Sequence, residues 1–256
     1  MIPCEKPTFL TYTKPLLTAM VQAATPDEAI SIIAGALYDG AEAFGIQLEN
    51  LKREYRDEAT LRGIFEACQG RPIYITSYRN SESTGYTDEE CVEYLLMGLR
   101  AGATLCDVMG DFFHPEPHEL TYDPAAVRRQ AEVIARIHEM GGEVLMSSHL
   151  HAFFTCEETL AVARSQVERG ADVVKIVGFA QDEEEMMADL NTIHALKREL
   201  NVPFLYLANG AHSRLIRQMG ASLGVCMYLC VPEYRPINSK EQPRLRETKL
   251  LRDCLG

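Results

Sequence analysis

The chain has 256 residues, of which 46% are hydrophobic and 24% charged, a composition typical of a globular protein. The formal net charge of -12 argues against a nucleic acid or an anionic membrane surface as partner, because both need a basic surface. A small anionic substrate remains possible, since a few local arginines or lysines can hold it. The length suits a single α/β domain, and no change of composition marks a linker within residues 1–256.

The sequence shows no targeting or membrane signal. The first ten residues, MIPCEKPTFL, lack a basic segment followed by an apolar one, and no apolar run approaches the ~18 residues of a membrane span. The eight cysteines form no Cys-x-x-Cys pair, and Cys226 and Cys230 lie in an apolar run, so we expect them in the core. Free thiols without a secretion signal favour a reducing cytoplasm.

Short apolar runs alternate with longer amphipathic segments along the chain. The expected strands are 15–21, 44–49, 72–78, 103–109, 143–149, 172–179, 203–209 and 222–230. A helix is expected after each strand, beginning near Pro26, Asp57, Asp88, Asp123, Cys156, Asp182, His212 and Pro243. Thr25 before Pro26 and Asp123 before Pro124 are typical helix N-caps.

Eight strand–helix units in about 250 residues predict an α/β fold of the (β/α)8 type, a TIM barrel. A doubly wound open sheet is the alternative, but it predicts a glycine-rich phosphate loop after an early strand, and the sequence has none. The longest irregular segments, 110–122 and 231–243, follow the fourth and eighth expected strands. Both therefore lie at the carboxyl ends of strands, where barrel enzymes build their active sites.

Lys175 interrupts the apolar, β-branched run GADVVKIVGF. A lysine in a buried strand is costly unless its charge is paired or its amine is neutral. A side chain that points into the barrel would be desolvated, which frees the amine to attack a carbonyl group. The alternative is a structural lysine that extends its ammonium group to water between the barrel and its helices.

His149 closes the strand before, in the segment SSHLH. Neighbouring strands lie ~4.8 Å apart, so His149 and Lys175 can face each other across one strand spacing. A lysine nucleophile beside a proton-shuttling histidine suits Schiff-base chemistry. His149 and His151 also have a metal-ligand spacing, but the sequence offers them no clear carboxylate partner.

Further polar residues lie at or near the expected strand ends. Arg79 and Arg214 suit recognition of a carboxylate or phosphate, although each could equally form a surface salt bridge. The others could orient the lysine and the histidine: Gln47, Glu49, Glu82 and Asp107. Asp107 lies in an otherwise apolar run and therefore needs a partner, catalytic or structural.

The segments PLLTAMV, PIYITSYR, CDVM, VLMSSH, VVKI and HSRL, in this order, resemble type I 3-dehydroquinate dehydratases over nearly the whole chain. The resemblance implies a (β/α)8 barrel, usually a homodimer, that uses no metal or cofactor. It implies a lyase of the shikimate pathway that converts 3-dehydroquinate to 3-dehydroshikimate, in biosynthesis or in catabolism.

The resemblance also implies roles for single residues. Lys175 would form an imine with the substrate ketone, and His149 would act as general acid and base. Arg214 would hold the substrate carboxylate, and Arg79 would match a second arginine of the site. Asp107 would match the acid that lies behind the lysine–histidine pair.

The residues around this expected reaction centre depart from the family pattern. Gln47 and Glu49, in FGIQLENLK, stand where the family usually has a glutamate and an arginine. Met109 replaces a second acid in the fourth strand. A positive charge thus becomes a negative one. Two hypotheses for the substrate follow, 3-dehydroquinate itself or a similar cyclic β-hydroxy ketone.

Two loops differ as well. After the third strand the family usually has Glu-Gly-Gly, and here NSESTGY offers Glu82 or Ser83. The last loop usually carries Ser-x-Pro-Gly-Gln, and here EYRPINSKEQP offers Tyr234, Pro236 and Asn238 as loose matches.

The leading hypothesis is therefore a Schiff-base dehydratase with a small, carboxylate-bearing substrate. A class I aldolase-like carbon–carbon lyase would use the same lysine. A metal-dependent hydrolase or isomerase would use histidines, drawn from His149, His151, His114 and His118. A non-catalytic barrel that binds a ligand or a partner protein would tolerate replacement of Lys175.

Overall fold

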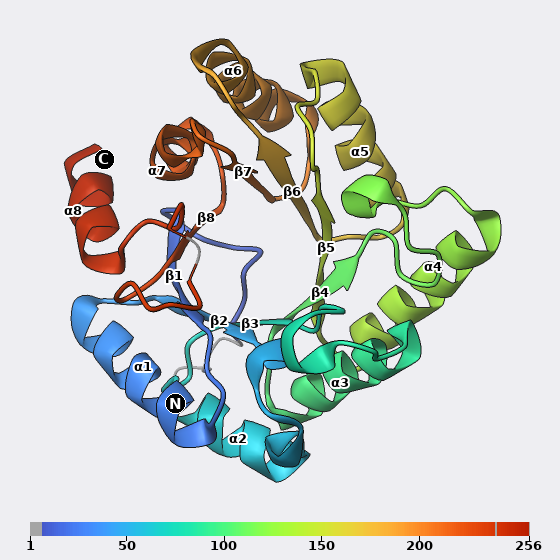
Figure 1. Cartoon of the computed structure of the whole chain (residues 1–256), viewed down its shortest axis with the longest axis vertical. Coiled ribbons are helices and arrows are strands. Elements are labelled where there is room, and N and C mark those ends of the chain that lie inside the picture. The colour runs from blue at the N-terminus through green and yellow to red at the C-terminus, as the bar shows by residue number, and fades with distance from the viewer. Residues whose placement is uncertain (1–6, 239, 256) are drawn as a thin grey trace.

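The computed structural model describes residues 7–238 and 240–255 of the chain. In this part, parallel strands alternate with α-helices that form an outer ring, which confirms the predicted (β/α)8 barrel (Figure 1). The strands are β1 (Leu16–Val21), β2 (Ala43–Gln47), β3 (Ile73–Thr76), β4 (Leu105–Met109), β5 (Glu143–His149), β6 (Val173–Phe179), β7 (Phe204–Asn209) and β8 (Met227–Cys230). The helices are α1 (Pro26–Asp39), α2 (Glu58–Glu66), α3 (Asp88–Ala101), α4 (Pro124–Glu139), α5 (Cys156–Glu168), α6 (Glu183–Glu199), α7 (Ser213–Leu223) and α8 (Leu245–Leu255).

The strands pair in the order β7-β6-β5-β4-β3-β2-β1-β8. Between the two ends of this order, the N–H of Cys226, just before β8, donates to the carbonyl of Phe204 in β7 at 2.9 Å. No ladder joins β7 to β8 in the described residues. The barrel is therefore nearly closed, and its least hydrogen-bonded seam lies between β7 and β8.

The predicted bounds hold for most elements, and two differ for clear reasons. The second strand ends at Gln47, and the turn Leu48–Asn50 carries Glu49 just beyond the strand. The strand predicted over 222–230 is wrong in its first half, because α7 continues to Leu223. Gly224 then ends that helix with a φ of 127°, a conformation that glycine adopts without strain.

The two predicted N-cap residues, Thr25 and Asp123, cap their helices in the structure. The Thr25 side chain accepts a hydrogen bond from the N–H of Glu28, and the Asp123 side chain accepts from the N–H groups of Ala125 and Ala126.

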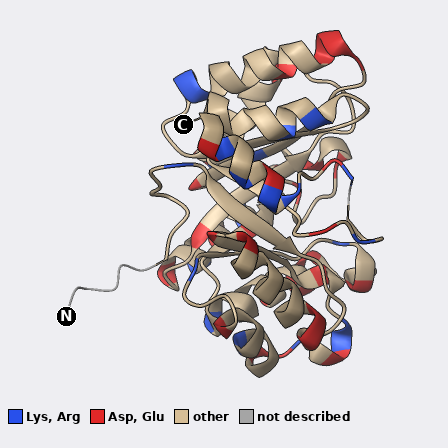
Figure 2. Cartoon of the chain, turned by 90° about the vertical axis from the view of Figure 1, so that its left-hand side faces the viewer, with Lys and Arg blue, Asp and Glu red and all other residues tan. Residues whose placement is uncertain are grey.

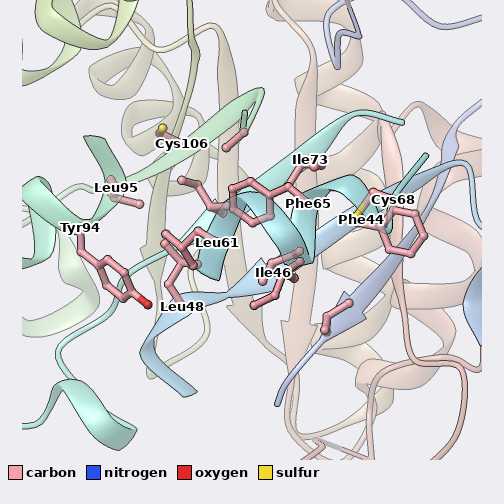
Figure 3. Packing of buried hydrophobic residues seen from close by; sticks show 14 of the residues in the cluster. Phe44, Ile46, Leu48, Leu61, Phe65, Cys68, Ile73, Tyr94, Leu95 and Cys106 are labelled. Carbon is pink, nitrogen blue, oxygen red and sulfur yellow. The ribbon is translucent and has the colours of Figure 1, made fainter. Parts of the chain in front are cut away.

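The apolar core lies between the barrel and its helices. Phe44 and Ile46 on β2 pack among buried residues of the neighbouring helices, including Leu61 and Phe65 of α2 (Figure 3). Gly45, between them, faces the barrel interior, where an added Cβ would lie 2.4 Å from Met20 Sδ. This glycine therefore leaves room for the side chains that fill the barrel.

Charged residues mark the helices and loops around the strands (Figure 2). Cys226 and Cys230 are buried, as predicted. Of the helices in the described ranges, none is both long and apolar enough to cross a membrane.

Candidate active site

Lys175 lies on β6 and points into the barrel. Its Nζ lies 3.0 Å from Tyr74 Oη, 2.6 Å from Tyr78 Oη and 3.0 Å from Asp107 Oδ2. These partners come from β3, the residues just after it, and β4. None of them lies on β5 or β7, the strands next to β6, so the side chain reaches them through the barrel interior. Lys175 is only 4% exposed, so its amine is enclosed by groups that hydrogen-bond to it.

Asp107 is fully buried and accepts hydrogen bonds from several side chains. Ser147 Oγ donates to Oδ1 at 2.5 Å, and Tyr78 Oη donates to Oδ2 at 2.6 Å. Tyr74 Oη donates to Oδ2 as well. Burial alone would raise the pKa of Asp107, but the charge of Lys175 and these hydrogen bonds hold it below its ordinary value. Asp107 is therefore a carboxylate, and it balances a positive charge on Lys175.

The two tyrosines are the main part of this cluster that sequence analysis missed. Burial, together with the charge of Asp107, raises the pKa of both hydroxyls well above the ordinary value, so both are protonated. A signal for them exists in the segment PIYITSY. Tyr74, Thr76 and Tyr78 recur with the period of two that places side chains on one face of a strand.

Thr76, between the tyrosines, reaches a second buried acid. Its hydroxyl donates to Glu49 at 2.8 Å, and Glu49 is 1% exposed in the turn after β2. Burial raises the pKa of Glu49 to about 7, and the nearby carboxylate of Asp107 acts in the same direction. Glu49 can therefore gain or lose a proton near neutral pH.

His149 ends β5 and is partly exposed. The expected pairing placed it opposite Lys175, but in the structure Ser147 lies opposite Lys175, and His149 lies opposite Val177. His149 is thus two residues nearer the carboxyl end of the barrel than the lysine. Its ring stands edge-on to that of Tyr78, with ring centroids 5.5 Å apart.

The imidazole of His149 is held by an acid that sequence analysis did not single out. Nδ1 hydrogen-bonds to Glu119 Oε2, from the loop between β4 and α4. Burial would raise the pKa of Glu119, but the hydrogen bond from His149 and the charges of His149 and Lys175 lower it. His118 and Glu119 have φ values of 68° and 50°, in the left-handed region that residues other than glycine rarely adopt. The sequence offered one signal for Glu119, because the segment 110–122 that contains it was expected at the catalytic end of the barrel.

A cavity of about 460 Å³ opens at this end of the barrel. Four of the predicted site residues line it: Gln47, Glu49, Arg79 and His149. His151, a candidate of the metal-dependent alternative, also lines it. Residues that were not predicted for the site complete the lining: Gln22, Asn50, Tyr78, Asn80, Ser81, Met109, Glu119, Asn209 and Ile237. The wall combines amide side chains with two acids, so it suits a substrate with several hydroxyl groups.

Arg79 contributes a guanidinium group to the wall, and acids surround it. It forms ion pairs with Asp111 at 2.7 Å and Asp88 at 2.5 Å. Burial opposes the charge, but the two carboxylates raise the pKa of Arg79. An anionic substrate group would have to take the place of one of them.

The other six predicted residues are absent from this lining, namely the buried Lys175 and Asp107 and four residues outside the barrel interior. Arg214 is exposed, with Nη2 3.4 Å from the carbonyl of Lys240, and Glu82 is exposed as well. Tyr234 is half exposed and donates to the carbonyl of Gln242 at 3.1 Å. Asn238 lines a smaller neighbouring cavity. It donates to Gln22, a residue of both cavities.

The other histidines considered for a metal site, His114, His118 and His151, lie in the segments after β4 and β5. The N–H of His151 donates to Nδ1 of His118 at 3.1 Å, and His114 contacts Glu116. Within residues 7–238 and 240–255, no group of three or more His, Cys, Asp or Glu is arranged to hold a metal ion.

Known proteins share this fold. A model of the family "Type I 3-dehydroquinase" matches residues 18–247. A search of curated proteins gives no match. Among solved structures, 3-dehydroquinate dehydratase from Geobacillus kaustophilus HTA426 superposes with a TM-score of 0.81 at 18% identity, over 96% of this chain and 93% of that one. The type I enzyme from Clostridium difficile, solved with covalently modified comenic acid, gives a TM-score of 0.79 at 15% identity, over 96% of this chain and 94% of that one.

Proposed function

Because this chain belongs to the type I 3-dehydroquinase family and is therefore a carbon–oxygen lyase, we propose that it dehydrates a cyclic β-hydroxy ketone through an imine on Lys175. The first substrate to consider is 3-dehydroquinate, which would yield 3-dehydroshikimate. The observation that carries the proposal is the buried Lys175, which hydrogen-bonds to Tyr78 of the cavity wall and pairs with the carboxylate of Asp107.

The proposed chemistry needs no group from outside the chain. The ammonium group of Lys175 first passes a proton to a neighbouring group, and the neutral amine adds to the ketone carbon. The carbinolamine takes up that proton as one water leaves, which gives a protonated imine. A base removes the proton from the adjacent carbon, and the imine nitrogen takes up the electron pair as an enamine forms. The enamine expels the β-hydroxyl group, which leaves as water after protonation. Hydrolysis of the conjugated imine consumes one water and restores Lys175, so the net change is the loss of one water from the substrate.

His149 suits the role of the group that moves the protons at the two substrate carbons. Glu119 accepts from Nδ1, which leaves Nε2 as the nitrogen available to the substrate. The carboxylate also stabilises the imidazolium that forms when His149 takes a proton. Because His149 lines the cavity at the rim, the substrate can lie between it and Lys175.

Arg79 is our candidate for the substrate carboxylate, because it is the arginine that lines the cavity in the described part of the chain. The carboxylate would replace Asp88 or Asp111 in a paired hydrogen bond. Binding of the carboxylate by Arg214 stays a prediction, and paired variants of the two arginines decide between them.

The test is reduction with borohydride in the presence of 3-dehydroquinate, followed by mass spectrometry of peptides. We expect a stable adduct on the peptide that contains Lys175, absent from Lys175→Ala. Dehydration is followed in parallel by the ultraviolet absorbance of the conjugated ketone product. A folded wild-type protein that gives neither an adduct nor product would contradict the proposal for this substrate.

A further inference from the structure

We propose that the hydroxyl of Tyr78, and not His149, exchanges protons at the carbon–nitrogen centre on Lys175 while the imine forms and breaks. This inference rests on the imine chemistry of the proposed function. It divides the proton transfers between two groups. Tyr78 serves the carbon that is bonded to Lys175, and His149 serves the neighbouring carbons of the substrate.

The first support is position. Three groups hydrogen-bond to Nζ of Lys175, namely the hydroxyls of Tyr74 and Tyr78 and the carboxylate of Asp107. Of these three, Tyr78 lines the cavity that the structure describes, whereas the other two are fully buried and are absent from its lining. A ketone that approaches Nζ from the cavity therefore meets the Tyr78 hydroxyl beside the atom that attacks it.

The second support is the location of His149. In the described residues, the hydrogen bonds of Nζ go to the tyrosines and the aspartate, and none goes to the imidazole. The rings of Tyr78 and His149 are nearly perpendicular, at 88°, with ring centroids 5.5 Å apart. Tyr78 thus contacts both the nucleophile and the rim histidine, and it is the nearer of the two groups to the nitrogen.

The third support is that the Tyr78 hydroxyl is protonated before the reaction. Burial, with the charge of Asp107, keeps the Tyr78 hydroxyl protonated before the reaction, so it begins as a donor. When the carbinolamine collapses, its C–O bond breaks, the nitrogen lone pair forms the C=N bond, and Tyr78 gives its proton to the departing hydroxyl, which leaves as water. The phenolate that results lies beside the positive iminium. During hydrolysis a water attacks that carbon and returns a proton to Tyr78.

Tyr74 provides a matched control for Tyr78. Both hydroxyls contact Nζ of Lys175 and both donate to the same oxygen of Asp107. A purely structural role, in which the tyrosines hold the lysine–aspartate pair, would make Tyr74→Phe and Tyr78→Phe equivalent. A role in proton exchange requires access to the cavity, which Tyr78 lines and Tyr74 does not.

The experiment measures the single-turnover rate of reducible imine on Lys175, with borohydride in excess, for the wild type and both phenylalanine variants. Two probes are used: 3-dehydroquinate and the small neutral ketone hydroxyacetone. We expect Tyr78→Phe to slow imine formation by roughly 10² to 10⁴-fold, the usual contribution of a positioned acid–base group, and Tyr74→Phe to slow it by less than about tenfold. Circular dichroism and thermal melting establish that each variant is folded.

Equal losses in the two variants would overturn the inference, and so would an unchanged rate in Tyr78→Phe. A wild-type adduct with hydroxyacetone but not with 3-dehydroquinate would contradict that substrate alone, and the rate ratio with hydroxyacetone would still decide the role of Tyr78. If the wild type forms no imine with either probe, both the inference and the imine chemistry are wrong.

Discussion

Glu119, from the loop after β4, holds the imidazole of His149 at the end of β5 through Nδ1. The pair joins the ends of two neighbouring strands at the mouth of the barrel, and it leaves Nε2 as the nitrogen available to the proposed substrate. The loop places the Glu119 carboxylate beside His149 by adopting left-handed backbone angles at His118 and Glu119. A costly conformation that places a side chain against a catalytic candidate is consistent with a functional constraint.

Glu119→Gln should lower kcat by roughly 10²-fold, at the lower end of the contribution of a positioned acid–base group, because it removes the charge that stabilises the imidazolium. Glu116→Gln is the control, since Glu116 lies in the same loop and contacts His114 instead. Steady-state kinetics at several pH values provides the measurement. A loss of the same size in both variants would indicate a general effect on the loop.

Glu49→Gln should increase stability at alkaline pH. The pKa of Glu49 rises from 4.5 to about 7 on folding, so the wild type loses stability as the pH increases from about 4.5 to about 7. This loss is on the order of 3 kcal/mol at pH 8, because one pKa unit corresponds to about 1.4 kcal/mol. Denaturant unfolding at pH 5 and pH 8 measures the difference. Glu82→Gln, at an exposed position, should change neither value, and a wild-type-like pH dependence in Glu49→Gln would refute the prediction.

Asp107→Asn should destabilise the fold by about 3–5 kcal/mol, the usual cost of leaving one partner of a buried ion pair unpaired. The double variant Asp107→Asn, Lys175→Met should recover most of this loss, since it removes both charges. Unfolding free energies at pH 7 test the comparison. The folded-state pKa of Asp107 lies below 3.8, so its stabilising contribution is present above pH 3.8 and is lost as the pH falls through the folded-state value. No recovery in the double variant would mean that the pair is not coupled.

The two arginines differ in their expected effect on substrate binding. Arg79→Ala should raise KM for 3-dehydroquinate about 10- to 100-fold, because a hydrogen bond to a charged group contributes about 1.5–3 kcal/mol. Arg214→Ala should change KM less than about threefold, since this exposed residue does not line the cavity in the described structure. A larger increase in KM for Arg214→Ala than for Arg79→Ala would indicate that Arg214 binds the substrate carboxylate. Trapping of hydroxyacetone, which has no carboxylate, should be unaffected by either variant.

Periodicity and capping were sufficient to predict the barrel, since each strand–helix unit carries its own local signals. Lys175 and Asp107 could also be predicted, because a charge in an apolar strand is conspicuous in sequence. Their direct contact could not be predicted, since β4 and β6 are separated by β5, and only the barrel interior brings the two side chains together.

The partners of these residues were harder to predict from sequence. A tyrosine such as Tyr74 in a strand is ordinarily a core residue, so its hydroxyl draws no attention until an acceptor is seen beside it. Glu119 lies in an irregular loop, and its position depends on backbone angles that no residue type there demands. Arg79 lines the cavity, its role in substrate binding stays a prediction, and its ion pairs with Asp88 and Asp111 depend on tertiary structure.

The sparse hydrogen bonding between β7 and β8 has a consequence for how the barrel opens. Backbone amides along this seam should exchange with deuterium faster than those of β4, β5 and β6, which are paired on both sides. Asn209, which ends β7, lies on the cavity wall, so local opening of the seam would widen the mouth on that side. Strands β4 and β6, which carry Asp107 and Lys175, are paired on both sides and would keep their shape while substrate enters and product leaves.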